Sequence, residues 1–304
     1  MARWKGGVRV TVESVTGLIG LGNMGRPMAT NLVAAGRHLV VYDAAGTAGR
    51  APQGTDPARS SAEVGERSTL VLFSLPDGEA VLSVASELAG AEGLSARIVV
   101  DTSTIGMAAS RQAKEILAQA GIEYVDAPVS GGVAGARSAT LSMMCAGSVE
   151  TIDGLRPLLA PVVQHIFHVG NEPGQAQGMK LLNNFLAATG IAASSEAFAF
   201  GERIGLDLRT MVDVVNVSTG RNMATLDKFP NRVLTGTYDA GFTSRLLLKD
   251  VLLYESAARE AGSAVAVGPC VADVWRRFED SAPGSDITRM FPFIRSLGRP
   301  AGED

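Results

Sequence analysis

The sequence is poor in cysteine, histidine and aromatic residues, and each shortage excludes a class of protein. Two cysteines in 304 residues, Cys145 and Cys270, cannot form a disulfide framework, so we expect small buried apolar side chains. Of the three histidines, His165 and His168 lie on a predicted strand, where their spacing puts them on opposite faces, and His38 is remote. No metal site is therefore predicted. With only 5% aromatic residues, the core is built from Ala, Val, Leu and Gly, which suits helices packed on a parallel sheet.

Long apolar runs and an excess of positive charge are also missing. Without a run of about 18 apolar residues, no membrane span is predicted. A net charge of -4 and a pI of about 5.5 argue against a general nucleic-acid binder, although a local basic patch stays open. The N-terminus carries Arg3, Lys5 and Arg9 but no apolar stretch with a cleavage site, which predicts a cytoplasmic protein. The length and the 46% hydrophobic content predict a globular chain of one large or two medium domains.

Short apolar runs separated by helical stretches fill the first part of the chain. The runs cover residues 16–20, 38–43, 69–75, 97–101, 122–126, 141–146 and 163–169. Continuous apolar strands of this kind belong to parallel sheets that helices cover on both faces. Because crossovers are right-handed, the pattern predicts an α/β fold with a doubly wound Rossmann sheet over residues 1–172.

The pattern changes after residue 170. A polar segment with Pro173 spans residues 171–178, and apolar or small residues then recur every three or four positions from Met179 to Ile204. This predicts one long helix, and because its other faces are only weakly polar we expect it to be enclosed, between domains or between subunits. Further helices are predicted at 207–217, 244–261 and 266–279. We therefore expect an all-α C-terminal domain over residues 173–304, for substrate binding and dimerisation, in a homodimer or homotetramer.

A nucleotide-binding motif opens the first predicted helix. The residues Gly20, Leu21, Gly22, Asn23, Met24 and Gly25 match G-x-G-x-x-G. They follow a predicted strand, and Asp43 ends the next strand about 20 residues later, which completes the Rossmann fingerprint. Gly20 would allow the tight turn, Gly22 the approach of the pyrophosphate and Gly25 close helix–strand packing.

Asp43 bears on which nicotinamide cofactor is bound. A carboxylate there can accept hydrogen bonds from the ribose hydroxyls and would repel a 2′-phosphate. No arginine follows it directly, and Arg50 is the nearest cation. The sequence therefore predicts NAD in preference to NADP. The alternative is that Asp43 is only a solvated turn residue.

Four motifs in order resemble the β-hydroxyacid dehydrogenase family, which includes 3-hydroxyisobutyrate dehydrogenase. They are GLIGLGNMGRPMATNL (17–32), DAPVSGG (126–132), GQAQGMKLLNN (174–184) and the pair Lys249–Asp250, and the resemblance spans about residues 16–278. It implies an oxidoreductase that transfers hydride between NAD(P) and the CH–OH group of a small 3-hydroxy acid. It also implies a C-terminal domain like that of 6-phosphogluconate dehydrogenase and a homo-oligomer.

The resemblance assigns a substrate-binding motif and a catalytic motif. Ser130, Gly131 and Gly132 would bind the substrate carboxylate through a hydroxyl and open backbone N–H groups. Lys180 would be the general acid/base and Asn184 would orient the substrate. The two are four residues apart on the long helix, so they share a face. Ala176 departs from the family pattern, which has glycine there, and this small change should affect loop geometry more than chemistry.

Further residues match the family less specifically. Leu75 and Pro76 would lie by the adenosine, Thr104 near the nicotinamide ribose, and Lys249 would close over the cofactor. From its chemistry alone, Arg221 is a candidate for a second substrate carboxylate, and a surface salt bridge is an equal alternative. Two other functions stay open: an imine reductase-like enzyme, although such enzymes generally lack the lysine, and a non-catalytic NAD-binding scaffold.

Overall fold

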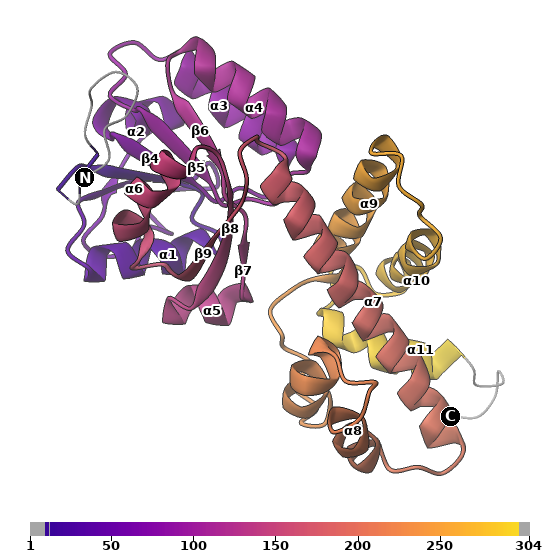
Figure 1. Ribbon diagram of the computed structural model, residues 1–304. Helices are drawn as coiled ribbons and strands as arrows, with labels where there is room; N and C mark the ends of the chain where they lie inside the picture. The colour runs from indigo at the N-terminus through magenta and orange to yellow at the C-terminus, as the bar shows by residue number, and fades with distance from the viewer. Residues whose placement is uncertain (1–9, 12, 298–304) are drawn as a thin grey trace. The chain divides into compact units, whose positions relative to one another are not determined.

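The computed structural model describes residues 10, 11 and 13–297, so Arg3, Lys5 and Arg9 lie outside it. The chain divides into two compact units, one ending at Lys180 and the other beginning at Leu181. Helix α7 (Gln175–Arg203) runs from the first unit into the second (Figure 1). The domain boundary expected at residue 172 stays a prediction. No helix of the described residues, α7 included, is long and apolar enough to cross a membrane.

The N-terminal unit contains the doubly wound sheet that the apolar runs predict. Six parallel strands stand in the order β3-β2-β1-β4-β5-β6. They are β3 (Asp56–Pro57), β2 (Leu39–Tyr42), β1 (Thr16–Ile19), β4 (Leu70–Phe73), β5 (Ile98–Asp101) and β6 (Glu123–Asp126). This is the Rossmann order, whose ligands bind at the carboxyl ends of the strands where the winding reverses, here between β1 and β4.

The far edge of the sheet departs from the all-parallel expectation. β8 (Leu141–Ala146) runs antiparallel to β6 and to the short β7 (Val129–Ser130), while β9 (Val163–Gly170) is parallel to β8. Residues 131–140, which join β7 to β8, are fewer than the dozen or so residues that a parallel crossover needs. The sequence analysis did not predict β3 and β7, because each strand has only two residues and two residues show no periodic pattern.

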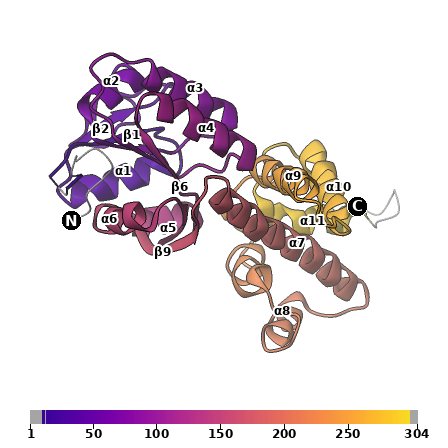
Figure 2. The same ribbon diagram turned by 45° about the horizontal axis from the view of Figure 1, so that its top comes forward.

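Helices cover both faces of the sheet, and side-chain alternation separates two cores. On one face lie α1 (Gly25–Ala34), α5 (Gly132–Ser138) and α6 (Val149–Leu159); on the other lie α2 (Ser61–Arg67), α3 (Gly78–Ala89) and α4 (Met107–Gln119), as Figure 2 shows. Leu18 belongs to the first core and Ile19 to the second, because successive strand side chains point to opposite faces.

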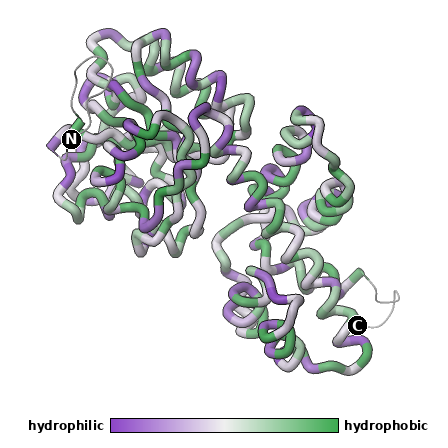
Figure 3. Tube along the Cα trace, in the orientation of Figure 1, coloured by the Kyte–Doolittle hydropathy of each residue, from purple (hydrophilic) through white to green (hydrophobic). Residues whose placement is uncertain are grey.

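The C-terminal unit is helical. After α7 it contains α8 (Leu208–Asn216), a π-helix η1 (Ala224–Val233), α9 (Ser244–Glu260), α10 (Gly268–Ser281), a short 3₁₀ turn η2 (Ile287–Arg289) and α11 (Met290–Leu297). Its core includes Trp275, fully buried, whose indole N–H donates to the carbonyl of Ala188 on α7 at 3.2 Å. The sequence did not predict η1 or α11, where Pro230 and Pro292 interrupt the pattern. Hydrophobic residues are distributed through both units (Figure 3).

One expectation about burial needs correction. Cys145 is buried as expected, but Cys270 is exposed, because α10 turns its other face, with Val271, Ala272 and Trp275, to the core. Within the described residues of the C-terminal unit, the apolar face of α7 is not enclosed. Its larger apolar residues in that unit are each between 44% and 63% exposed: Leu182, Leu186, Phe200 and, just past the helix, Ile204.

Candidate active site

The glycine-rich loop is built so that two glycines permit close packing and one faces open space. A Cβ on Gly20, whose φ is +97°, would lie 2.2 Å from the carbonyl oxygen of Ser74, and one on Gly25 would lie 1.8 Å from that of Gly20. A Cβ on Gly22 would meet no protein atom within 4 Å. The loop therefore folds tightly between β1 and β4 and leaves its middle open to a ligand, as a pyrophosphate requires.

Asp43 connects the end of β2 to that loop. One of its carboxylate oxygens accepts a hydrogen bond from the Leu21 N–H at 2.7 Å, and the other accepts one from the Ala45 N–H at 2.8 Å. The Nε of Arg50 lies 3.7 Å from this second oxygen, and only 11% of the Asp43 side chain is exposed. The Asp43 carboxylate is therefore held by two backbone N–H groups and is not a solvated turn residue.

A cavity of about 420 Å³ lies beside the loop. Its lining includes Gly22 and Asn23, and it carries three guanidinium groups, those of Arg26, Arg50 and Arg137. Arginine is well suited to phosphate, so the open glycine and the positive lining together fit an anionic dinucleotide.

The loops after β4 and β5 meet at the same edge of the sheet. Leu75 donates its backbone N–H to the hydroxyl of Ser103 at 2.9 Å, which ties the Leu75–Pro76 turn to the segment that carries Thr104. Leu75 and Thr104 are half-buried, and Pro76 is exposed. The loops thus stand where a doubly wound sheet binds its ligand.

The segment after β6 combines a short strand with two glycines of positive φ. Ser130 pairs with Ser142 of β8, and it is half-buried. Gly131 and Gly132 have φ of +128° and +62°, where other residues would be strained, and a Cβ on Gly132 would meet nothing. Both glycines are exposed, so the turn is open to solvent.

Lys180 and Asn184 lie one turn apart on α7, with 8% and 6% exposure. The Asn184 amide nitrogen donates to a carboxylate oxygen of Asp250 on α9 at 2.6 Å. The other Asp250 oxygen lies 3.0 Å from Nζ of Lys249. Asp250 thus joins two residues that the sequence singled out, and it was itself missed. The signal that could have found it is the acid in the Lys249–Asp250 motif.

Two buried carboxylates that the sequence analysis also missed end neighbouring strands. Asp101 of β5 and Asp126 of β6 are paired in register, and neither is exposed. Asp101 accepts hydrogen bonds from the Ser103 N–H at 2.9 Å and the Tyr124 hydroxyl at 3.0 Å. Burial raises the pKa of Asp101 to about 7, with a smaller contribution from the charge of Asp126, and burial raises the pKa of Asp126 as well.

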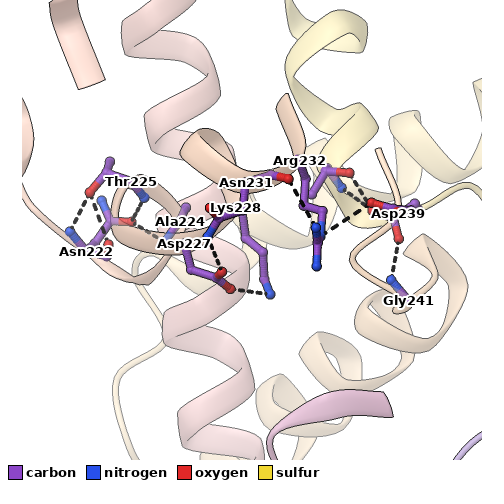
Figure 4. A network of polar contacts seen from close by, with 11 residues as sticks. Asn222, Ala224, Thr225, Asp227, Lys228, Asn231, Arg232, Asp239 and Gly241 are labelled. Carbon is purple, nitrogen blue, oxygen red and sulfur yellow. Dashed lines mark hydrogen bonds and ion pairs between the residues drawn. The ribbon is translucent and has the colours of Figure 1, made fainter. Parts of the chain in front are cut away.

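Arg221 lies exposed in the segment between α8 and η1. The chain that follows, from Asn222 to Gly241, contains a polar network (Figure 4). In that network the side-chain oxygen of Asn222 accepts from the Ala224 N–H at 2.8 Å, and Lys228 pairs with Asp227 at 2.7 Å. The role of Arg221 stays a prediction. Among the described residues, no three His, Cys, Asp or Glu side chains are grouped to hold a metal ion.

The family comparisons cover nearly the whole chain. Residues 15–170 match the model of the NAD-binding domain of 6-phosphogluconate dehydrogenase, and residues 174–294 match that of the NAD-binding region of NADP-dependent 3-hydroxyisobutyrate dehydrogenase.

Individual relatives give the same picture. A probable 3-hydroxyisobutyrate dehydrogenase of Mycobacterium tuberculosis is 32% identical, over 91% of this chain and 97% of its own. The 3-hydroxyisobutyrate dehydrogenase of Pseudomonas aeruginosa is 36% identical, over 82% and 87%. A solved structure of the M. tuberculosis enzyme with L-serine has a TM-score of 0.85 at 31% identity, covering 94% of this chain and all of that one.

The fold and the site define a nicotinamide-dependent oxidoreductase that acts on CH–OH groups. The chain belongs to the β-hydroxyacid dehydrogenase family, as the four sequence motifs imply.

The raised pKa of Asp101 predicts how stability depends on pH. Between about pH 4 and pH 7 the folded chain keeps a proton that the unfolded chain has lost, so the contribution of Asp101 to stability falls as pH rises through this window. Asp101→Asn cannot ionise. We therefore expect its free energy of unfolding to exceed that of the parent chain at pH 8, with the difference shrinking towards pH 4, measured by urea unfolding.

The matched control is Glu115→Gln, the same chemical change at an exposed position on α4. The difference in free energy of unfolding between this control and the parent chain should not grow as the pH rises. A constant offset between Asp101→Asn and the parent chain at all pH values would contradict the buried ionisation.

Proposed function

We propose that this chain interconverts a small 3-hydroxy acid and its carbonyl form, with NAD preferred over NADP and Lys180 as the general acid/base. The observation that carries the proposal is the pair Lys180 and Asn184, one turn apart on α7 and both more than nine-tenths buried. A buried lysine beside a buried amide is an arrangement for handling a proton on an oriented oxygen. The 3-hydroxyisobutyrate dehydrogenases among the relatives support a substrate such as 3-hydroxyisobutyrate.

Each of these residues has a separate role in the proposed reaction. In oxidation Nζ of Lys180 accepts the hydroxyl proton, and in reduction its ammonium returns a proton to the carbonyl oxygen and stabilises negative charge there. Ser130, Gly131 and Gly132 bind the carboxylate, which fixes the carbinol carbon. Asn184, held by Asp250 at 2.6 Å, orients the substrate oxygen. The nicotinamide cofactor, when bound, supplies the hydride acceptor or donor.

The cofactor would be held by the carboxyl-edge loops. Gly20–Gly25 accommodate the pyrophosphate, Asp43 accepts from the ribose hydroxyls, and Leu75, Pro76 and Thr104 add further contacts. Lys249, on α9 and not on these loops, would close over the cofactor as the family resemblance implies. The NAD preference rests on the Asp43 carboxylate, which would repel a 2′-phosphate. Arg50 opposes this effect, since its Nε lies 3.7 Å from that carboxylate.

Two other functions remain as outcomes of the assays. An imine reductase-like enzyme or a non-catalytic NAD-binding scaffold would have no use for a buried acid/base lysine, and the 8% exposure of Lys180 disfavours both. A scaffold would bind NADH and turn over no hydroxy acid. An imine reductase would consume NADPH or NADH with imines only.

Replacing the lysine tests the proposed chemistry. Lys180→Met keeps the length of the side chain but removes the proton-transferring group, so we expect kcat with 3-hydroxyisobutyrate to fall by about 10²- to 10⁴-fold. The Kd for NADH, measured by fluorescence, should stay within about twofold of the parent value. Lys228→Met, in the C-terminal unit, is the control and should retain activity. Parent-like turnover by folded Lys180→Met would refute the acid/base role.

Replacing the ribose acceptor tests the cofactor preference. Asp43→Ala removes an ionised hydrogen-bond acceptor and the repulsion of a 2′-phosphate together. We expect the ratio of kcat/KM for NAD to that for NADP to fall by about tenfold or more. Asp153→Ala, an exposed carboxylate on α6, should leave the ratio unchanged. An unaltered ratio in Asp43→Ala would mean that another group selects the cofactor.

The exposed apolar face of α7 supports a homodimer or homotetramer. Leu186 and Phe200 are 62% and 63% exposed, and contiguous apolar surface of this kind marks an interaction site. Sedimentation equilibrium should therefore give a mass of about two or four times 31.5 kDa. Replacing both residues by Glu should dissociate the oligomer, and a monomeric parent chain would show the proposal to be wrong.

A further inference from the structure

One buried amide contacts two other segments of the N-terminal unit, the loop after β5 and the end of β6. Gln177 lies in the first turns of α7 and is fully buried. Its side-chain oxygen accepts from the backbone N–H groups of Ile105 at 2.8 Å and Gly106 at 3.2 Å. Its side-chain nitrogen donates to the carbonyl of Ser103 at 3.1 Å and to the carboxylate of Asp126 at 2.7 Å. All four hydrogen-bonding positions of the amide are in use.

Asp126 holds the same turn from the other side. The oxygen that does not contact the Gln177 side chain accepts from the Gly174 N–H at 2.8 Å and the Gln177 N–H at 3.2 Å. N–H groups at a helix start have no partner within the helix, and a carboxylate near them is stabilising. The last residue of β6 thus accepts N–H groups at the start of α7.

Apolar packing closes the remaining side of this turn. Ala176, where the family motif has glycine, is fully buried and packs with Met144 and Ala146 of β8. The methyl group therefore occupies space that a glycine would leave unfilled. The first turn of α7 is held by the β5 loop, by the end of β6 and by β8, and it has little freedom to shift.

The two segments that Gln177 contacts, and α7 itself, each carry a residue of the proposed chemistry. The loop after β5 carries Thr104, the segment that begins at Asp126 carries Ser130, and α7 carries Lys180 one turn beyond Gln177. We propose that Gln177 and Asp126 are positioning residues for the reaction: their hydrogen bonds fix Lys180 relative to the substrate-carboxylate turn and the nicotinamide side. This rests on the acid/base role of Lys180 proposed above.

Only a neutral amide satisfies all of the neighbours of Gln177. Two backbone N–H groups require an acceptor, and the Ser103 carbonyl and the Asp126 carboxylate both require a donor. A carboxyl group at this position could accept the first pair when ionised but would leave the second pair without a donor and would repel Asp126. Each mismatch would tilt the start of α7, and a displacement of about 1 Å of a reacting group can cost about 100-fold in rate.

The test is Gln177→Glu, which replaces the NH₂ group of the amide by an oxygen. We expect kcat at pH 8 to fall by about 10- to 100-fold, while KM for the hydroxy acid and Kd for NADH stay within about twofold. As the pH is lowered towards 5.5, the introduced carboxyl group gains a proton and can donate to Asp126 again. The ratio of variant to parent kcat should therefore rise, which a merely structural defect would not produce.

Gln175→Glu provides the matched control. It is the same substitution two residues earlier on an exposed position of α7, and the side-chain oxygen of Gln175 only accepts, from the Glu172 N–H at 2.9 Å. A carboxylate keeps that role, so kcat and the pH profile should equal those of the parent chain.

The outcomes separate the two proposals. Parent-like kcat in Gln177→Glu, or a loss that follows the unfolded fraction and does not recover at low pH, overturns the positioning role while an inactive Lys180→Met leaves the proposed function intact. Activity in Lys180→Met overturns the proposed function itself. If Gln177→Glu fails to fold, Asp126→Asn is measured in the same way. It leaves one oxygen for three N–H donors, and an undiminished kcat would overturn the proposal.

Discussion

The carboxylate of Asp126 is buried at the end of β6 and accepts three N–H groups, from Gly174 and from the backbone and side chain of Gln177. A buried charge is tolerated only where such donors replace water. These donors belong to the start of α7. The hydrogen bonds to Asp126 therefore hold the start of that helix at the end of β6. In the positioning role proposed for Asp126, the place of Lys180 follows from these hydrogen bonds.

The same edge of the sheet shows how differently three acids are used. Asp43 is held by the backbone N–H groups of Leu21 and Ala45. Asp126 is satisfied by three donors. Asp101 has one N–H and one hydroxyl for its two oxygens, and its pKa is raised to about 7. Burial is the largest cause of the raised pKa of Asp101, and the hydrogen bonds that this carboxylate accepts offset it only in part.

Much of the fold and part of the site could be read from local patterns. The seven apolar runs correspond to β1, β2, β4, β5, β6, β8 and β9. All but β9 are almost wholly buried, and a strand buried on both faces must be continuously apolar. The positions of Gly20–Gly25 and Asp43 could be predicted because a single strand–helix–strand unit sets their spacing. The reversed direction of β8, the π-helix η1 and the exposure of Cys270 were not, since each depends on what packs against the segment and not on its own residues.

The sequence by itself determined the doubly wound sheet, the glycine-rich turn and the residue types of the lysine motif, because each of these follows from periodicity or from a few neighbouring residues. Only the tertiary structure decided that Asp126 and Gln177, 51 positions apart, are partners. It also revealed that Asp250 holds Asn184, and that one face of α7 lies exposed on the single chain. The physical reason is that burial and hydrogen-bond satisfaction are properties of a residue's surroundings, which distant segments supply only when the chain has folded.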